Sequence, residues 1–230
     1  MSDLKVIYED NHIIVVEKPV NVPSQQDKTN DIDMLTIIKQ YLKEKYNKPG
    51  NVYLGLIHRL DRPVGGVMVF AKTSKAAARL SEQVRNKEFK KKYLAIVDGK
   101  MENGSGVLED YLLKNERTNT SKVVEEGTKN AKYAKLEYEV IAYNEETDLS
   151  LVKVTLHTGR HHQIRLQFAN FRSWFIRRPK VRNQRKGQTN LLMGIWTNHK
   201  TPNNQGRNDI YSITKTRRKL EDIRVNSKLT

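Results

Sequence analysis

Short runs of apolar residues, many of them β-branched, recur along the first 170 residues and predict strands more often than helices. The first two runs, residues 5–8 and 13–17, flank a polar Glu-Asp-Asn turn, a pattern typical of a β-hairpin. Further strands are expected at residues 66–72, 93–97, 131–142 and 149–157. The last two of these alternate between apolar and polar positions around a second polar turn, so they are expected to pair.

Two stretches with an apolar residue at every third or fourth position predict amphipathic helices. Asp31 or Asp33 can cap the first helix, which is expected to continue to about Tyr46, before a Pro-Gly stop. Ser74 is expected to cap the second, whose apolar face comprises Ala77, Leu80 and Val84. Strands outnumber helices and follow one another through short turns, so we expect an α+β fold with a mixed, largely antiparallel sheet and packed helices.

Composition narrows the class of protein. Hydrophobic residues make up 37% of the chain and charged residues 30%, and no apolar run is long enough to cross a bilayer. The start of the chain lacks the apolar stretch of a signal peptide, so we expect a cytoplasmic protein with no membrane partner. The absence of cysteine excludes disulfides, thiol catalysis and thiolate metal sites.

The positive charge is concentrated at one end of the chain. The formal net charge is +16, and residues 171–230 hold 15 Lys and Arg against 3 Asp and Glu, whereas residues 1–170 hold 27 against 23. Residues 171–230 also lack a sustained helical or strand period, as a disordered basic tail would. Such a tail would favour a polyanionic partner, but the first 170 residues are nearly neutral.

Three segments carry residues suited to chemistry. They read HRLDRPVGG at residues 58–66, KKKYLA at 90–95 and TGRHHQIRL at 158–166. Taken singly, they fit a turn with an exposed acid, a basic strand edge, and a turn leading into a helix that buries Ile164 and Phe168. A metal site at His157, His161 and His162 is disfavoured, because Gly159 interrupts any helix joining them and no carboxylate cluster completes the site.

Taken together, the three segments closely resemble the RluA-type family of pseudouridine synthases, whose members carry HRLD, K-x-Y-L-A and GR-x-HQIR motifs in this order. The VVEKP segment at residues 15–19 is similar to the first strand motif of the family. The resemblance covers residues 4–170 and implies that Asp61 is the catalytic carboxylate, Tyr93 the active-site tyrosine and Arg165 the partner of Asp61. One departure is Val-Gly-Gly at 64–66, where the family commonly has Thr-Ser-Gly.

The resemblance implies a cofactor-independent, monomeric enzyme without a metal that isomerises a uridine of ribosomal or transfer RNA to pseudouridine. The alternative is a catalytically inactive RNA-binding remnant of the same fold. The residues expected to contact RNA are Arg59, Lys72, Lys92, Arg160 and His162. In this chemistry Arg165 would supply the counter-charge for Asp61, and Tyr93 would stack on the uracil. The target nucleotide would leave its stack to reach them.

The segment after residue 170 departs from the family, which usually continues with a sequence like LGHPIVGDPKYG. One permitted set of codons for residues 172–182, read one nucleotide later, encodes Gly-His-Gly-Leu-Phe-Gly-Asp-Gln-Lys-Tyr-Gly. A frameshift near codon 170, by sequencing error or true mutation, would account for this. We therefore expect an incomplete catalytic domain at residues 1–170, lacking its C-terminal strands, and an out-of-frame or disordered basic tail at 171–230.

The frameshift hypothesis predicts one missing or extra nucleotide near codon 170. Sequencing codons 160–185 from genomic DNA and from transcript tests it. If one base is missing or added in both, residues 171–230 are an error and the functional assignment belongs to the corrected protein. If the written frame stands in both, the gene has lost its C-terminal strands, and a degraded or inactive synthase is the better description.

Overall fold

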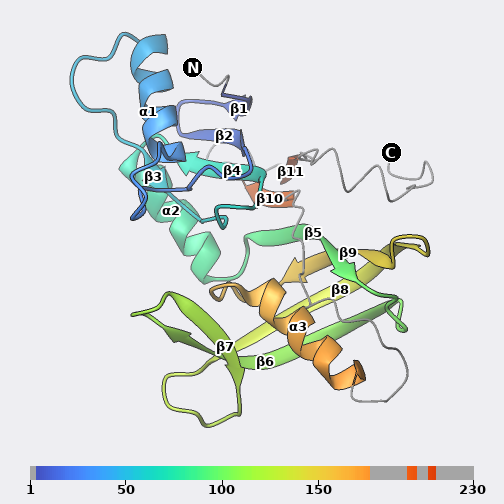
Figure 1. Ribbon diagram of the computed structural model, residues 1–230. Coiled ribbons are helices and arrows are strands. Elements are labelled where there is room, and N and C mark those ends of the chain that lie inside the picture. Colours follow the sequence, from blue (N-terminus) through green and yellow to red (C-terminus); the bar gives the residue numbers. More distant parts are fainter. Residues whose placement is uncertain (1–3, 177–195, 201–206, 211–230) are drawn as a thin grey trace. The chain divides into compact units, whose positions relative to one another are not determined.

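The computed structural model describes residues 4–176, 196–200 and 207–210. These fall into two compact units, one containing residues 4–91 and the other beginning at residue 92. The described strands form two sheets (Figure 1). The α+β class with a largely antiparallel arrangement of strands is confirmed, although two sheets occur where one was expected. Short turns join several of the neighbouring strands, and such turns can join only antiparallel neighbours.

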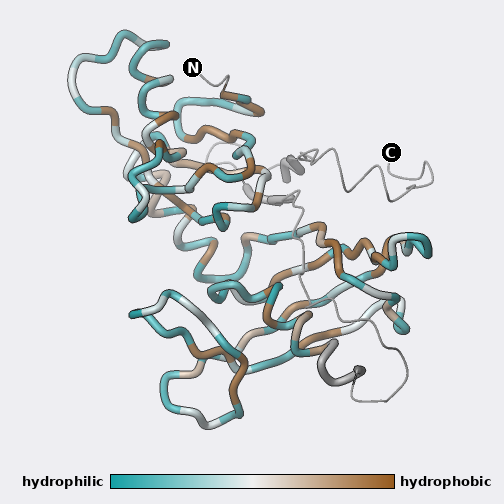
Figure 2. Tube along the Cα trace, viewed as in Figure 1, coloured by the Kyte–Doolittle hydropathy of each residue, from teal (hydrophilic) through white to brown (hydrophobic). Residues whose placement is uncertain are grey.

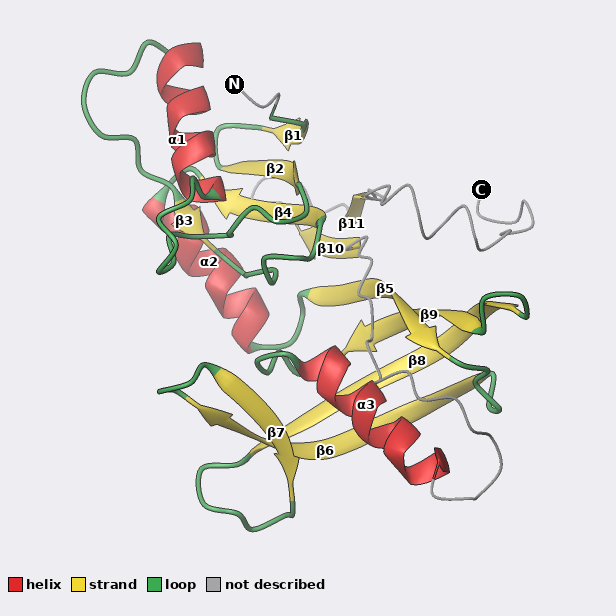
Figure 3. Cartoon of the chain, viewed as in Figure 1, coloured by secondary structure: helices red, strands yellow, loops and turns green. Residues whose placement is uncertain are grey.

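Residues 4–91 of the first unit form four strands and two helices, which Figure 3 colours by type. They are β1 (Val6–Glu9), β2 (Ile13–Lys18), α1 (Met34–Lys45), β3 (Gly55–Leu56), β4 (Gly66–Ala71) and α2 (Ser74–Arg85). The strand order is β1-β2-β4-β3. The expected opening hairpin, the buried strand at 66–72 and both helices are therefore confirmed.

Local side-chain hydrogen bonds set where these elements begin. The Asp10 carboxylate accepts hydrogen bonds from the backbone N–H groups of His12 and Ile13, both at 2.7 Å, and so closes the turn between β1 and β2. Asp33, one of the two expected caps, accepts from Thr36 N at the start of α1. The prediction of Ser74 as the second cap is wrong by one residue: Thr73 is extended and accepts from Ala76 N.

The core of the first unit lies between its sheet and its helices. Strands β2 and β4 are buried almost throughout, which explains their continuous apolar runs. Helix α1 buries one residue per turn, and α2 buries Ala76 and Leu80 instead of the full expected face. The residues that α1 buries are Met34, Ile38 and Leu42.

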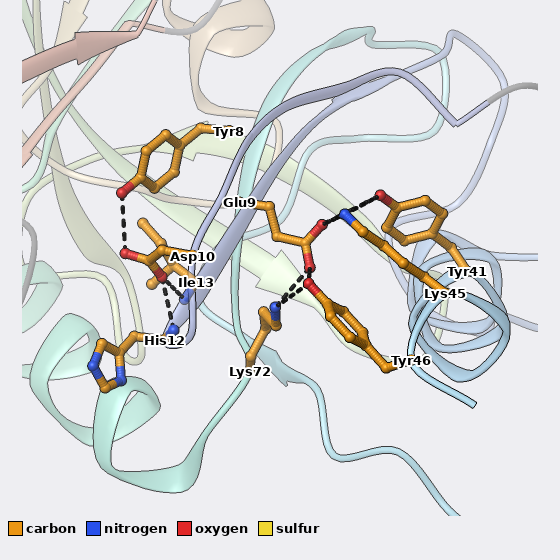
Figure 4. A network of polar contacts seen from close by, with 9 residues as sticks. All are labelled: Tyr8, Glu9, Asp10, His12, Ile13, Tyr41, Lys45, Tyr46 and Lys72. Carbon is orange, nitrogen blue, oxygen red and sulfur yellow. Dashed lines mark hydrogen bonds and ion pairs between the residues drawn. The ribbon is translucent and has the colours of Figure 1, made fainter. Parts of the chain in front are cut away.

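A polar cluster around Glu9 fastens α1 to β1 (Figure 4). The Glu9 carboxylate accepts hydrogen bonds from Lys45 Nζ at 2.8 Å, Lys72 Nζ at 2.6 Å and Tyr46 Oη at 2.8 Å, and its side chain is 7% exposed. Burial alone would raise the pKa of Glu9, but these three donors outweigh it and lower the pKa to about 2. Glu9 is thus held ionised at the junction of α1, β1 and the end of β4.

The second unit contains five strands and one long helix. They are β5 (Lys90–Asp98), β6 (Ser105–Asn115), β7 (Thr120–Val124), β8 (Lys132–Asn144), β9 (Leu149–Leu156) and α3 (Gln163–Ile176). The strand order is β5-β9-β8-β6-β7. The expected β8–β9 pair is confirmed, and the turn that joins the two strands is hydrophilic (Figure 2). Strands β6 and β7 were not predicted from the sequence.

Helix α3 lies across one face of this second sheet (Figure 3). It buries Ile164 and Phe168, as expected, and Phe168 meets the Tyr138 ring of β8 edge-on at 5.6 Å between centroids. Gly106 of β6 lies so close to Tyr138 that a Cβ there would fall 2.8 Å from the ring. Close packing therefore continues from the helix through Tyr138 to β6.

The expected boundary at residue 170 falls inside α3, which continues to Ile176. Beyond it, β10 (Trp196–Lys200) and β11 (Arg207–Ile210) form an antiparallel pair. The remainder of the expected tail, residues 177–195, 201–206 and 211–230, lies outside the described residues. Within the part that the structure describes, none of the helices combines the length and apolarity needed to cross a membrane.

Candidate active site

Asp61 lies in the turn that connects β3 to β4 and closes with a 2.9 Å hydrogen bond from Val64 N to Asp61 O. The residues on either side of it are held by the segment at 18–24. Ser24 Oγ donates to Leu60 O at 2.7 Å and accepts from Leu60 N at 3.1 Å. On the other side, Arg62 O accepts from Asn21 N at 2.7 Å. The backbone around the carboxylate is therefore fixed from a second segment of the chain.

Lys18, the last residue of β2, supplies a buried positive charge at this turn. Its exposed fraction is 0%, and its ammonium donates to Pro19 O at 2.8 Å and Arg62 O at 3.2 Å. Burial lowers the pKa of Lys18 to about 8, with the charge of Asp61 opposing the shift and that of Arg62 adding to it. At neutral pH the ammonium is retained, and it attracts the Asp61 carboxylate.

His58 begins the same turn and is held neutral. Its Nε2 accepts a hydrogen bond from Val69 N at 3.2 Å, and its ring packs on Phe89 with centroids 5.5 Å apart. The Nδ1 atom is shielded from solvent without a hydrogen-bond partner. Burial, assisted by the charge of Lys91, lowers the pKa of His58 to about 4.

In the second unit, Gln163 holds together the turn that carries the GR-x-HQIR residues. Its exposed fraction is 3%, and its amide uses all four hydrogen-bonding positions. The oxygen accepts from Thr158 Oγ1 and Arg160 N, and the nitrogen donates to Lys135 O and Gln167 Oε1. One buried side chain thus connects the turn, strand β8 and helix α3.

The same polar row continues along the inner face of α3. Gln167, which is fully buried, donates to Leu108 O, Ala134 O and the Asp110 carboxylate of the neighbouring strands. Asn170 donates to the other oxygen of Asp110 at 2.7 Å. These bonds fix the rotation of α3 about its axis, and with it the direction of Arg165.

The three expected catalytic residues fall in different units. Asp61 belongs to the first, whereas Tyr93, 6% exposed on β5, and Arg165, partly exposed in the first turn of α3, belong to the second. The expected pairing of Asp61 with Arg165 would therefore link residues of different units, and it stays a prediction.

The residues expected to contact RNA differ in their exposure and in the contacts that they make. Arg59 is exposed in the Asp61 turn and Lys92 is partly exposed on β5. Arg160 donates from Nε to Tyr133 O, and His162 stacks on His161 at 3.8 Å between centroids. The Lys72 side chain is only 8% exposed and is paired with Glu9, so it has the least surface for a phosphate.

Three residues of this site received no role from the sequence. Lys18 and Gln163 stand inside recognisable motifs, VVEKP and HQIR, and those motifs were the available signal. Ser24 stands in a polar loop with no motif. Of the three histidines considered for a metal site, His157 pairs with Glu137 at 2.9 Å. Among the described residues, no three metal-ligating side chains form a cluster.

The partly buried imidazole of His58, whose Nδ1 is shielded from solvent, predicts a pH-dependent stability. The unfolded chain binds a proton near pH 6.5 and the folded protein only near pH 4, so the free energy of unfolding falls as the pH drops through this window, by up to about 3 kcal/mol. Chemical denaturation at several pH values measures the slope. His58→Gln should flatten it and the exposed His157→Gln should not; equal slopes in wild type and His58→Gln would contradict the neutral ring.

Replacing Gln163 by leucine should destabilise the second unit. Leucine fills a similar volume but removes the hydrogen bonds that Gln163 makes to Arg160 N and to the buried Gln167 Oε1, at a cost of roughly 2–4 kcal/mol. Denaturant unfolding followed by circular dichroism gives the loss. The control is Gln40→Leu, which removes an amide bonded only to Glu44 on an exposed face of α1 and should cost less than about 0.5 kcal/mol. A loss at position 163 no larger than at position 40 would refute the connecting role.

Comparison with known proteins matches residues 12–170 to the RNA pseudouridylate synthase family model. The chain is 34% identical over 164 residues to the mitochondrial tRNA pseudouridine(32) synthase of Saccharomyces cerevisiae, covering 71% of this chain and 34% of that protein. It is 28% identical over 199 residues to ribosomal large subunit pseudouridine synthase C of Buchnera aphidicola from Acyrthosiphon pisum, covering 85% and 58%.

Among solved structures, Human RNA Pseudouridylate Synthase Domain Containing 1 has the same fold, with a TM-score of 0.64 at 19% identity and coverage of 91% of this chain and 83% of that one. The chain spans about half the length of several curated relatives, from 51% to 54%. The match over residues 12–170 includes all the motif segments around Asp61, Tyr93 and Arg165. The chain belongs to the RNA pseudouridylate synthase family.

Proposed function

We propose that this protein isomerises a uridine in ribosomal or transfer RNA to pseudouridine, with Asp61 as the essential carboxylate. The observation that carries the proposal is the Asp61 turn itself, whose flanking residues are both held by residues 18–24 and which lies beside the buried Lys18 ammonium. Family membership supports the same reaction. Two relatives are named for ribosomal and transfer RNA, and these are the substrate classes we propose.

The reaction rearranges atoms within one nucleotide. The bond from N1 of uracil to C1′ of ribose breaks, the base turns, and a bond from C5 to C1′ forms; the C5 proton is lost and N1 gains one. Because nothing is oxidised or reduced overall, we propose no cofactor. A carboxylate beside the sugar can attack C1′, attack the base or remove a ribose proton, and all three uses require Asp61 to be ionised and held in place.

The remaining assignments follow from the chemistry of each side chain. Arg165 offers a planar guanidinium to pair with Asp61, and Tyr93 offers a ring to stack on uracil and a hydroxyl near the C5 proton. Arg59, Lys92, Arg160 and His162 are the proposed RNA contacts, with Lys72 a weaker candidate because of Glu9. We propose that the protein acts as a cytoplasmic monomer.

The second candidate function is an inactive RNA-binding remnant of the same fold. It is favoured by residues 171–230, whose sequence departs from the family after the HQIR helix. The two candidates differ in one observable, since only the enzyme exchanges the C5 hydrogen of uridine.

Tritium release from ribosomal or transfer RNA labelled at uridine C5 tests the enzyme. Wild-type protein should release tritium, and Asp61→Ala should reduce the rate at least about 100-fold, because removal of a group that handles charge or protons in the transition state has effects of this size. Asp148→Asn is the matched control: Asp148 is exposed in the β8–β9 turn, bonded to Tyr143, and should leave the rate unchanged.

Undiminished release by Asp61→Ala would refute the role of Asp61. Absence of release from wild type, with RNA binding equal in wild type and Asp61→Ala, would instead favour the remnant.

A further inference from the structure

The hydroxyl of Ser24 makes an unusual pair of hydrogen bonds beside Asp61. It donates to Leu60 O at 2.7 Å and accepts from Leu60 N at 3.1 Å, so a single side-chain atom satisfies both backbone polar groups of the residue preceding Asp61. Ser24 and Leu60 are each 5% exposed. Water therefore has little access to replace the hydroxyl if it is removed.

Ser24 works together with a second anchor on the opposite side of Asp61. Arg62 O accepts from both Asn21 N and Lys18 Nζ, so the turn is held before Asp61 by Ser24 and after it by the preceding residues of the same segment. The Arg62 side chain makes a further contact, because its guanidinium forms ion pairs with Asp27 and Asp31 in the loop that follows Ser24. Of these anchors, Ser24 alone uses a buried, uncharged side chain.

We infer that Ser24 is a positioning residue, which holds the Asp61 turn in its reactive geometry through the backbone of Leu60. The inference rests on the proposed function for its catalytic consequence. Ser24 is buried and has no surface to offer RNA, so its loss should affect the placement of the carboxylate and leave substrate binding intact.

Three variants separate this role from a general loss of stability. Ser24→Ala removes both hydrogen bonds. Ser24→Thr keeps the hydroxyl, and the flexible Met68 side chain, whose sulfur lies 3.6 Å from Ser24 Oγ, can shift to accommodate an added methyl group. Ser150→Ala is the matched control, because Ser150 is also buried and donates to a backbone oxygen, that of Gly99, in the second unit.

The kinetic test measures single-turnover tritium release and RNA affinity for each variant of the full chain. Ser24→Ala should slow the catalytic step about 10- to 100-fold with RNA affinity changed less than about threefold, since displacement of a catalytic group by an ångström has effects of this order. Ser24→Thr should recover most of the rate, and Ser150→Ala should retain it. A rate for Ser24→Ala equal to that of Ser150→Ala, or a loss confined to affinity, would overturn the inference.

Hydrogen exchange tests the same point without catalysis. The Leu60 amide donates to Ser24 Oγ, so Ser24→Ala should raise exchange in the peptide spanning residues 57–66 about tenfold or more, whereas Ser150→Ala should not. If Ser24→Ala does not fold, Ser24→Cys weakens both bonds at nearly constant volume and takes its place in both experiments.

The two measurements also distinguish this inference from the proposed function. Wild-type protein that releases no tritium overturns the function and the catalytic consequence of Ser24, while faster exchange in the Ser24 variant still supports its hold on the turn. Unchanged exchange in the Ser24 variants overturns the inference whether or not the enzyme is active.

Discussion

The antiparallel pairing of β2 with β4 is the constraint on which the Asp61 site depends. Its register sets Lys18 opposite Gly66, so the segment leaving β2 and the turn entering β4 meet at the same edge of the sheet. Gly66 has a φ of +146°, which a side chain would strain, and this lets the turn enter the strand directly. A slip of one residue would turn Lys18 to the other face and separate Ser24 from Leu60.

In the second unit, buried side-chain amides, not a strand register, hold helix α3 in place on the sheet. Gln163 and Gln167, one helical turn apart, attach α3 to the backbone of β8 and β6 through directional bonds. Apolar packing of Phe168 alone would allow the helix to rotate or slide, because such contacts are not directional. These bonds give a structural role to Gln163, which stands two residues before Arg165 in the same motif.

The sequence identified the candidate catalytic residues better than it identified the residues that hold them in position. Asp61, Tyr93 and Arg165 can be identified from motifs in the correct order along the chain, and this identification needs no information about tertiary contacts. The role of Ser24 could not be predicted, because its hydrogen-bond partner Leu60 lies 36 residues away and no motif distinguishes a serine in a polar loop. Lys72 is a similar case, since no local pattern around a lysine after a strand indicates that the carboxylate of Glu9 lies beside it.

By itself, the sequence determined the helices, the buried strands and the family, because hydrophobic periodicity, caps and motifs are local properties. Tertiary structure decided the rest. Strand β6 mixes acidic with apolar residues and is a strand because β8 and β7 bind it from both sides. The charge of Lys18, the neutrality of His58 and the ionisation of Glu9 likewise depend on burial and on partners distant in the chain, which no local pattern records.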